Sequence, residues 1–346
     1  MFNLKSIEIA QEAVVHLEIA LAKHLGYKYI IALKDETLAF QLSLETLSPK
    51  AEVLCSPLAS LSLHRTLCKL SLQPKYIDYK LDATLETRFL QRQLSQQSKC
   101  MILSHYQGVI TPSEPVQEFC HQHQLILIED ATQALHQHTK SGAVAALFSL
   151  NSLLGNDLIP GGVIATDDEQ LAEKLSVKVR GGYEKRKNWN YDIINCEPNL
   201  QLSIFHANIA LKCLETINSD NQKIRHLQTR YQDALSDVKM ITLPKQNNLS
   251  LERYFVVFLD PALFCPKEDI YNELRNAGIM VEVGLKPIYK TTAFMDESLH
   301  LFGAEELYKG VMLLPLHPNM SVGDITHIVN TFKKILDTYT YRGCSF

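Results

Sequence analysis

Apolar and amphipathic segments alternate along the first half of the chain. Leucines recur at helical spacing between His16 and Leu25, and Gly26 ends this helix before a strand at 29–33. The alternation then continues, with strands expected at 52–55, 75–79, 100–104 and 125–128 and helices at 37–47, 61–70, 86–96 and 115–124. Because parallel strands need a crossover of a dozen or more residues, this repeat predicts an α/β fold with a mostly parallel sheet between helices.

The pattern changes in the second half of the chain. An amphipathic stretch from Ile204 to Leu235 is long enough to bridge two domains. Around it we expect strands at 163–166, 254–259 and 280–284 and helices at 167–179, 267–277 and 324–336. The 346 residues also exceed the about 250–300 at which one hydrophobic core stops growing. We therefore predict a large domain at 1–235, bridging helix included, and a small C-terminal α+β domain at 236–346.

Asp130 directly follows the apolar strand expected at 125–128. Ligands of parallel α/β proteins bind beyond the carboxyl ends of the strands, so Asp130 is the first candidate functional residue. A helix N-cap or a solvated carboxylate at a strand end is the ordinary alternative.

Charge and cysteine usage narrow the possible partners. The net charge is −4 and the 34 Lys and Arg residues are dispersed, which argues against nucleic acid; the one basic run, at 180–187, is expected to be a mobile loop. The eight cysteines stand singly, as free thiols of a reduced protein do. No stretch reaches the ~18 apolar residues of a membrane span, and residues 1–10 lack a signal-peptide core. We expect a cytoplasmic protein.

A zinc site has to be considered at Cys120, His121 and His123, with His136 and His138 a strand later. Positions i, i+1 and i+3 of a helix do not converge on one point, whereas a structural zinc ion needs four ligands in tetrahedral geometry. We expect no metal site there.

Several separate motifs resemble one family. They are HYQGVITPSEPVQEFCHQHQLILIEDATQA at 105–134, LFSL at 147–150, GGVIATDDEQLAEKL at 161–175, AGIMVEV at 277–283 and LLPLHPNMS at 313–321. In order and spacing they are similar to the DegT/DnrJ/EryC1/StrS sugar-nucleotide aminotransferases. The resemblance implies the fold-type I architecture of pyridoxal-phosphate (PLP) enzymes, a dimer that builds each active site across its interface, and a nucleotide-sugar ligand.

The resemblance places four residues at a cofactor, either PLP or its amino form pyridoxamine phosphate (PMP). Asp130 matches the carboxylate that keeps the pyridine nitrogen protonated, and Gln133 lies near the ring hydroxyl. Ser149 matches a phosphate ligand, and Asn199 matches a residue that reaches the phosphate from a neighbouring subunit.

Other positions depart from the family. Leu154 stands five residues after Ser149, where the family has the lysine that binds PLP, so no catalytic residue is assigned. The family's Ser-Gly-Thr turn at a helix N-terminus is Asp35-Glu36-Thr37, whose carboxylates suit the helix but repel a phosphate. The ring-covering aromatic residue, an arginine and the family's histidines are also replaced, at Ser60 or Leu61, Gln201 and 284–289.

Three hypotheses follow. The first is a homologue that no longer transaminates by the lysine mechanism and binds a nucleotide sugar or pairs with an active relative. The second is an active PLP- or PMP-dependent enzyme of cell-surface amino-sugar synthesis, using a displaced lysine or external PMP; the neighbouring Lys140 and Lys174 reach the pocket only if the loop is remodelled. The third is a structural or regulatory partner without a ligand. The resemblance implies a homodimer, and a heteromer with an active relative is the alternative.

Overall fold

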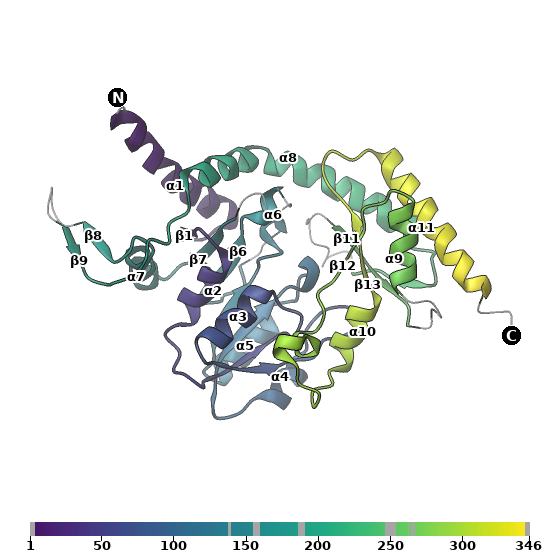
Figure 1. The fold of residues 1–346 in the computed structure, drawn as a ribbon, viewed down its shortest axis with the longest axis horizontal. Helices are drawn as coiled ribbons and strands as arrows, with labels where there is room; N and C mark the ends of the chain where they lie inside the picture. The colour runs from purple at the N-terminus through teal and green to yellow at the C-terminus, as the bar shows by residue number, and fades with distance from the viewer. Residues whose placement is uncertain are drawn as a thin grey trace.

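The computed structural model describes residues 4–137, 140–154, 160–185, 191–245, 254–261, 263 and 267–342. Within this part of the chain a seven-stranded and a four-stranded sheet organise the fold, joined by the long helix α8 (Figure 1). The α/β class and the mostly parallel large sheet are as predicted.

The large sheet has the strand order β1-β7-β6-β5-β4-β2-β3. Its strands are β1 (Tyr29–Leu33), β2 (Glu52–Cys55), β3 (Gln73–Tyr76), β4 (Ser98–Ser104), β5 (Ile126–Asp130), β6 (Ala145–Ser149) and β7 (Gly162–Thr166). Only β7 runs against its neighbours. The strand expected at 75–79 is displaced to Gln73–Tyr76, because β3 can pair only along β2, which ends at Cys55.

Alternate side chains of the large sheet face two different helix layers, as the period of two in a strand requires. One face packs against α2 (Glu36–Leu44), α3 (Leu61–Lys69) and α7 (Glu169–Val179). The other face packs against α1 (Leu4–Leu25), α4 (Thr87–Gln93), α5 (Glu114–Gln122) and the first half of α8. The sheet is therefore buried on both faces, and its polar side chains gather at the strand ends.

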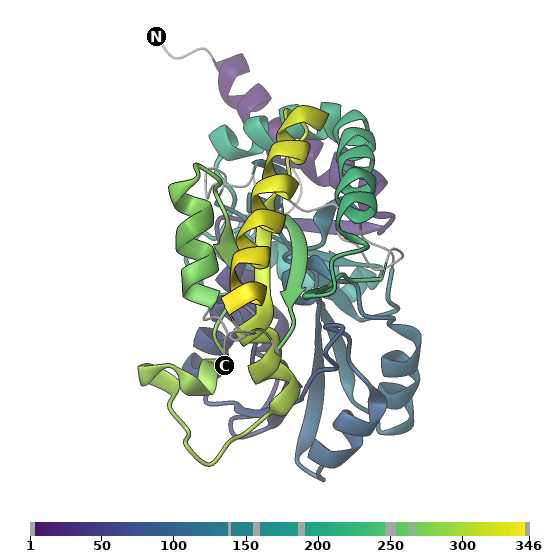
Figure 2. The same cartoon turned by 90° about the vertical axis from the view of Figure 1, so that its right-hand side faces the viewer.

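The small sheet is antiparallel in the order β10-β11-β13-β12. Its strands are β10 (Ile241–Thr242), β11 (Tyr254–Leu259), β12 (Glu282–Val283) and β13 (Val311–Pro315). Helices α9 (Lys267–Asn276) and α11 (Val322–Arg342) lie side by side over one face (Figure 2). Residues of the other face, including Val256, Phe258 and Leu313, pack with the large sheet and with α10 (Phe302–Gly310) in a shared core.

Helix α8 (Ile204–Leu235) has the predicted bounds and belongs to both cores. Ala207, Ala210 and Ile217 of its first half are buried against α1 and the large sheet. Ile224 and Tyr231 of its second half are buried under the small sheet. Because one helix contributes to both cores, the domain boundary proposed after residue 235 stays a prediction.

The prediction of a loop for the basic run at 180–187 is wrong, because part of this run forms a β-strand. Gly181 and Gly182, with φ of 75° and 78°, make a turn into β8 (Tyr183–Lys185), which pairs with β9 (Tyr191–Ile193). Residues 186 and 187 lie outside the described residues. Among the helices that the structure describes, none has the length and apolar content needed to cross a bilayer.

Glu18 of α1 covers the outer edge of the large sheet. Its Oε1 accepts a hydrogen bond of 2.9 Å from the backbone N–H of Ala32, in the edge strand β1. Pairing this N–H satisfies a donor that would otherwise be open to another chain. Burial raises the pKa of the carboxyl to about 7, against the smaller opposing effects of the Ala32 hydrogen bond and Arg180.

We expect Glu18→Gln to flatten the pH dependence of stability between pH 4.5 and 7. The folded protein holds this proton to a higher pH than the unfolded chain does, so the wild type loses stability as the pH rises through this window. The loss amounts to at most roughly 3 kcal/mol. Urea unfolding across this pH range measures it, with the exposed Glu12→Gln as the control that should follow the wild type. Equal slopes in wild type and Glu18→Gln would contradict the assignment.

Candidate functional site

Asp130 ends β5 at the carboxyl edge of the parallel strands, where the sequence places it. It is buried, and Oδ2 accepts a hydrogen bond of 3.0 Å from the Ser104 hydroxyl at the end of the paired strand β4. Oδ1 accepts from the hydroxyl and the backbone N–H of Thr132, at 2.7 and 3.3 Å. Burial raises the pKa of the carboxyl, and the bonds from Thr132 and Ser104 oppose this rise.

Glu36, at the first turn of α2, turns its carboxylate inward. Asp35 caps the helix by accepting a hydrogen bond of 2.7 Å from the Thr37 N–H, whereas Oε1 of Glu36 accepts one of 2.7 Å from the Ser62 hydroxyl. Burial raises the pKa of the Glu36 carboxyl; the hydroxyls of Ser62 and Ser149 lower it, and the nearby charge of Asp130 raises it. Residues from α2, α3 and β6 thus meet beside the end of β5.

Gly162 makes this meeting possible. It pairs with Ser149 across β6 and β7, and a Cβ at this position would lie 2.6 Å from the Asp35 carbonyl oxygen and 2.7 Å from the Glu36 Cα. Any larger residue would push the first turn of α2 away from the sheet. Gly162 is the first residue of β7, one position before the strand expected at 163–166, and its missing side chain lets Glu36 lie this close.

The described residues do not fit the phosphate of PLP. A phosphate at a helix N-terminus needs free N–H groups and hydroxyls that point to it. Here the Asp35 side chain already engages the Thr37 N–H, and the hydroxyls of Ser62 and Ser149 serve the Glu36 carboxyl. A phosphate would also meet the negative charge of these two acids. These donors are therefore engaged by acidic groups of the protein itself.

Leu154 is the last residue of the short helix α6 (Asn151–Leu154), which directly follows the strand of Ser149. Lys140 does not replace the missing lysine, because its ammonium group pairs with Asp167 and lies 4.7 Å from the ring centroid of Tyr27. Asp167 follows the reversed strand β7, so this pair is at the edge of the sheet opposite Asp130. Lys174 is exposed on α7.

Among the described residues, the side chains of the other two predicted cofactor residues make no hydrogen bond to this cluster, although the Lys34 amine, next to Asp35, donates a hydrogen bond of 3.2 Å to the backbone carbonyl of Asn199. Gln133 is half-buried just beyond the Asp130–Thr132 turn, and its side chain has no hydrogen bond within the described part of the chain. Asn199 is exposed, and its Oδ1 accepts a hydrogen bond of 3.0 Å from the Gln201 N–H. A contact of Asn199 with a neighbouring subunit remains a prediction.

A buried acid–histidine pair lies next to Asp130 and was not identified from the sequence. His105 Nε2 is 2.7 Å from Glu129 Oε1, and both side chains are almost fully enclosed. The Thr111 N–H donates to Nδ1, so we assign the ring proton to Nε2, which donates to Glu129. Ser141 donates to the second oxygen of Glu129. The hydrogen bond between His105 and Glu129 links the ends of β4 and β5. The two side chains meet because these strands are neighbours in the sheet, which the sequence alone does not reveal.

Ser60 and Leu61, the positions where the family's ring-covering aromatic residue is replaced, lie at the start of α3. Ser60 is the N-cap of α3, accepting a hydrogen bond from the Leu63 N–H, and Leu61 beside it is exposed. Among the described residues no three His, Cys, Asp or Glu side chains are grouped as a metal site would require. Cys120 is buried, while His138 lies outside the described residues.

Comparisons with known proteins agree with this architecture. The model of the DegT/DnrJ/EryC1/StrS aminotransferase family matches residues 5–333. The UDP-4-amino-4,6-dideoxy-N-acetyl-beta-L-altrosamine transaminase of Campylobacter jejuni subsp. jejuni serotype O:2 is 23% identical over 337 residues, covering 92% of this chain and 89% of that protein.

Two solved structures show the same fold. Helicobacter pylori PseC, an aminotransferase involved in the biosynthesis of pseudoaminic acid, superposes with a TM-score of 0.86 and 21% identity, covering 94% of this chain and 92% of its own. Bacillus subtilis ntda with bound cofactor PMP superposes with a TM-score of 0.83 and 22% identity. The match covers 94% of this chain and 77% of that chain. The overall architecture is therefore that of PLP-dependent sugar aminotransferases. Because the family model spans nearly the whole sequence, this chain belongs to the DegT/DnrJ/EryC1/StrS aminotransferase family.

Proposed function

We propose that this chain is a nucleotide-sugar-binding homologue that does not transaminate through a lysine-bound PLP. The observation that carries the proposal is the contact of the Glu36 carboxyl with the hydroxyls of Ser62 and Ser149, which an incoming phosphate would need. Leu154 points the same way, since leucine can neither form an imine nor transfer a proton. The ligand class rests on the relative from Campylobacter, whose name specifies a UDP-linked sugar.

A second candidate is an active PLP- or PMP-dependent enzyme of amino-sugar synthesis. Its support is the buried Asp130 at the strand end, together with relatives named as transaminases. PMP brings its own amino group and would not need a lysine for attachment. It carries the same phosphate as PLP, however, so the Glu36 carboxyl opposes both forms of the cofactor equally.

Binding and turnover separate the two candidates. We expect calorimetry to detect binding of a UDP-linked N-acetylhexosamine to the protein. UDP alone is the control, and the difference between the two affinities measures the contribution of the sugar. Neither PLP nor PMP should bind at concentrations that saturate a transaminase of the family. Transfer of the amino group of glutamate to a UDP-linked keto sugar would refute the first proposal and support the second. Failure to bind any UDP-linked sugar would refute the ligand class alone.

Restoring the lysine alone should not restore the cofactor. We expect wild type and Leu154→Lys to form no internal aldimine with PLP, whereas Asp35→Ser/Glu36→Gly/Leu154→Lys should bind PLP at least about tenfold more tightly than Leu154→Lys, a gain of ~1.4 kcal/mol. The reason is that the triple variant frees the helix N-terminus and both hydroxyls for the phosphate. Absorbance titration and borohydride trapping with peptide mapping measure this.

The matched control for the lysine is Leu153→Lys in the same Asp35→Ser/Glu36→Gly background. It should bind the phosphate group but form no adduct at position 153. An aldimine in Leu154→Lys with Glu36 intact would show that the carboxyl does not exclude the phosphate.

We also propose that a second chain, either a copy or an active relative, packs against the β8–β9 hairpin and the start of α8. Large apolar side chains are exposed on these consecutive elements, namely Tyr183, Ile193, Ile194, Ile204 and Phe205. A contiguous patch of exposed apolar side chains is typical of an interface between proteins. The family resemblance, which implies a dimer, supports the presence of a second chain but does not identify its surface.

Phe205→Glu should shift the protein toward the monomer. Phe205 is 70% exposed in the first turn of α8, where glutamate suits the helix dipole, so the substitution should not unfold the chain. Light scattering over a dilution series measures the assembly. Phe302→Glu is the matched control, since Phe302 is 69% exposed in the first turn of α10. If the wild type is a monomer, a heteromer with an active relative is the remaining form of this proposal. Equal effects of Phe205→Glu and Phe302→Glu on the assembly would refute the proposed surface.

A further inference from the structure

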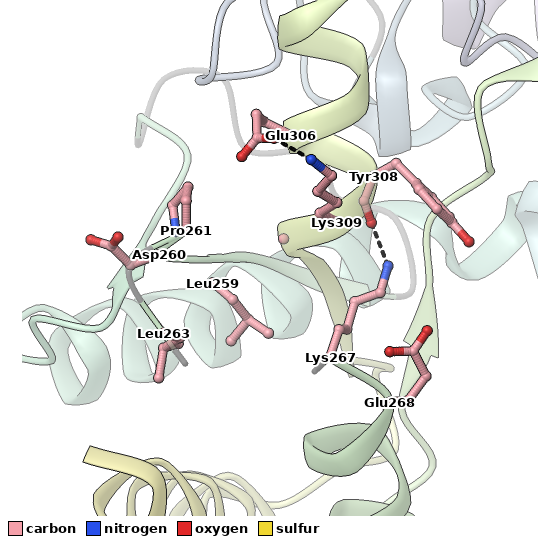
Figure 3. Close-up of a pocket in the computed structure, with 10 residues that line it drawn as sticks. Leu259, Asp260, Pro261, Leu263, Lys267, Glu268, Glu306, Tyr308 and Lys309 are labelled. Carbon is pink, nitrogen blue, oxygen red and sulfur yellow. Dashed lines mark hydrogen bonds and ion pairs between the residues drawn. The ribbon is translucent and has the colours of Figure 1, made fainter. Parts of the chain in front are cut away.

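A cavity lies in the C-terminal part of the chain, and its lining residues do not include Asp130. It has a volume of about 390 Å³ and is formed by the end of β11, the start of α9 and the end of α10 (Figure 3). Its lining combines an apolar side with charged groups: Leu259, Asp260, Pro261, Leu263, Lys267, Glu268, Glu306, Tyr308, Lys309 and Gly310. None of these residues belongs to the cluster around Glu36.

The two lysines of this cavity have different environments. Lys309 forms an ion pair of 2.6 Å with Glu306, one turn earlier on α10. The Lys267 amine instead donates a hydrogen bond to the backbone carbonyl of Tyr308 and lies 4.3 Å from the centroid of its ring (Figure 3). Among the described residues no carboxylate pairs with Lys267. Its amine thus borders the cavity, and its contacts within the described part of the chain are a neutral carbonyl and an aromatic face.

The Tyr308 carbonyl and ring favour the charged ammonium, whereas burial favours the uncharged amine and is the larger effect. Burial lowers the pKa of Lys267 to about 8, with a smaller opposing effect from Glu268. As the first residue of α9, Lys267 also meets the positive end of the helix dipole. At pH 7 about one such amine in ten is unprotonated, against roughly one in 3,000 for an ordinary lysine. The other charged groups that line the cavity are Asp260 after β11 and the Glu306–Lys309 pair on α10.

The lining restricts which molecules can approach. Three carboxylates and two lysines line the cavity, a net charge of −1 with both amines protonated, which disfavours an anionic ligand. Leu259, Pro261 and Leu263 offer an apolar wall to a small uncharged molecule. A lysine that is desolvated beside such a wall is the usual setting for attack on a carbonyl carbon.

We propose that the cavity beside Tyr308 is a carbonyl-binding site in which Lys267 forms a Schiff base with a small uncharged aldehyde. The unprotonated amine, having released its proton to solvent, adds to the carbonyl carbon to give a carbinolamine. Loss of the former carbonyl oxygen as water then leaves a C=N bond. No oxidant or reductant is consumed, and hydrolysis reverses the reaction.

Reductive trapping tests this proposal in the full-length protein. With limiting propanal and cyanoborohydride at pH 7.5, peptide mapping should find Lys267 labelled at least tenfold faster than the median exposed lysine. The advantage should disappear in urea. Glyoxylate, a small aldehyde with a carboxylate, should label Lys267 no faster than the exposed lysines. The labelling rate with propanal should rise with a midpoint near pH 8.

Two variants separate the site from general lysine reactivity. Lys267→Arg should remove the fast reaction, whereas Lys309→Arg, which keeps the ion pair with Glu306, should leave it unchanged. Equal labelling of Lys267 and exposed lysines in the folded wild type would overturn the proposal, as would equal rates for propanal and glyoxylate. The outcome is independent of the function proposed for the Glu36 cluster, because an adduct at Lys267 maps to a different peptide from any adduct near position 154.

Discussion

The close approach of the first turn of α2 to β7 is the constraint on which the functional site depends. It requires Gly162, since a Cβ there would collide with the backbone of Asp35 and Glu36. The approach places a helix N-terminus beside the carboxyl ends of the parallel strands, an arrangement suited to an anionic ligand. Here the anion is supplied by the chain itself, as the carboxylate of Glu36.

The buried acids at this edge of the sheet are each satisfied by neutral donors. Hydroxyl groups serve Asp130 and Glu36, and a histidine and a serine serve Glu129. An acid bonded to hydroxyls keeps much of its desolvation cost, which is why burial is the largest influence on the pKa of Asp130 and of Glu36. Ser104 and Thr132 donate hydrogen bonds to both oxygens of Asp130, so the buried carboxyl has polar partners without a cation or a pyridinium.

Fold and chemistry depend on different residues. The architecture rests on apolar strands buried on both faces and on α8, which contributes to both cores, and neither requires a cofactor. Substitutions at Glu36 and Leu154 can therefore accumulate without disturbing the core. The family fold persists at 23% identity to the Campylobacter transaminase for this reason, and fold similarity alone does not establish the reaction.

The sequence by itself determined the α/β class, the bounds of α8 and the place of Asp130, because hydrophobic periodicity and strand ends are local properties. It also identified Leu154 and the acidic turn at Asp35 and Glu36 as departures from the family. It misplaced β3 and missed the β8–β9 hairpin, since strand limits depend on the partner strand. Only the tertiary structure decided that Glu36 meets Ser62 and Ser149, that His105 pairs with Glu129, and that Lys267 lies beside Tyr308. Each of these contacts joins residues distant in sequence, and no local pattern encodes which distant side chains the packing of sheets and helices brings together.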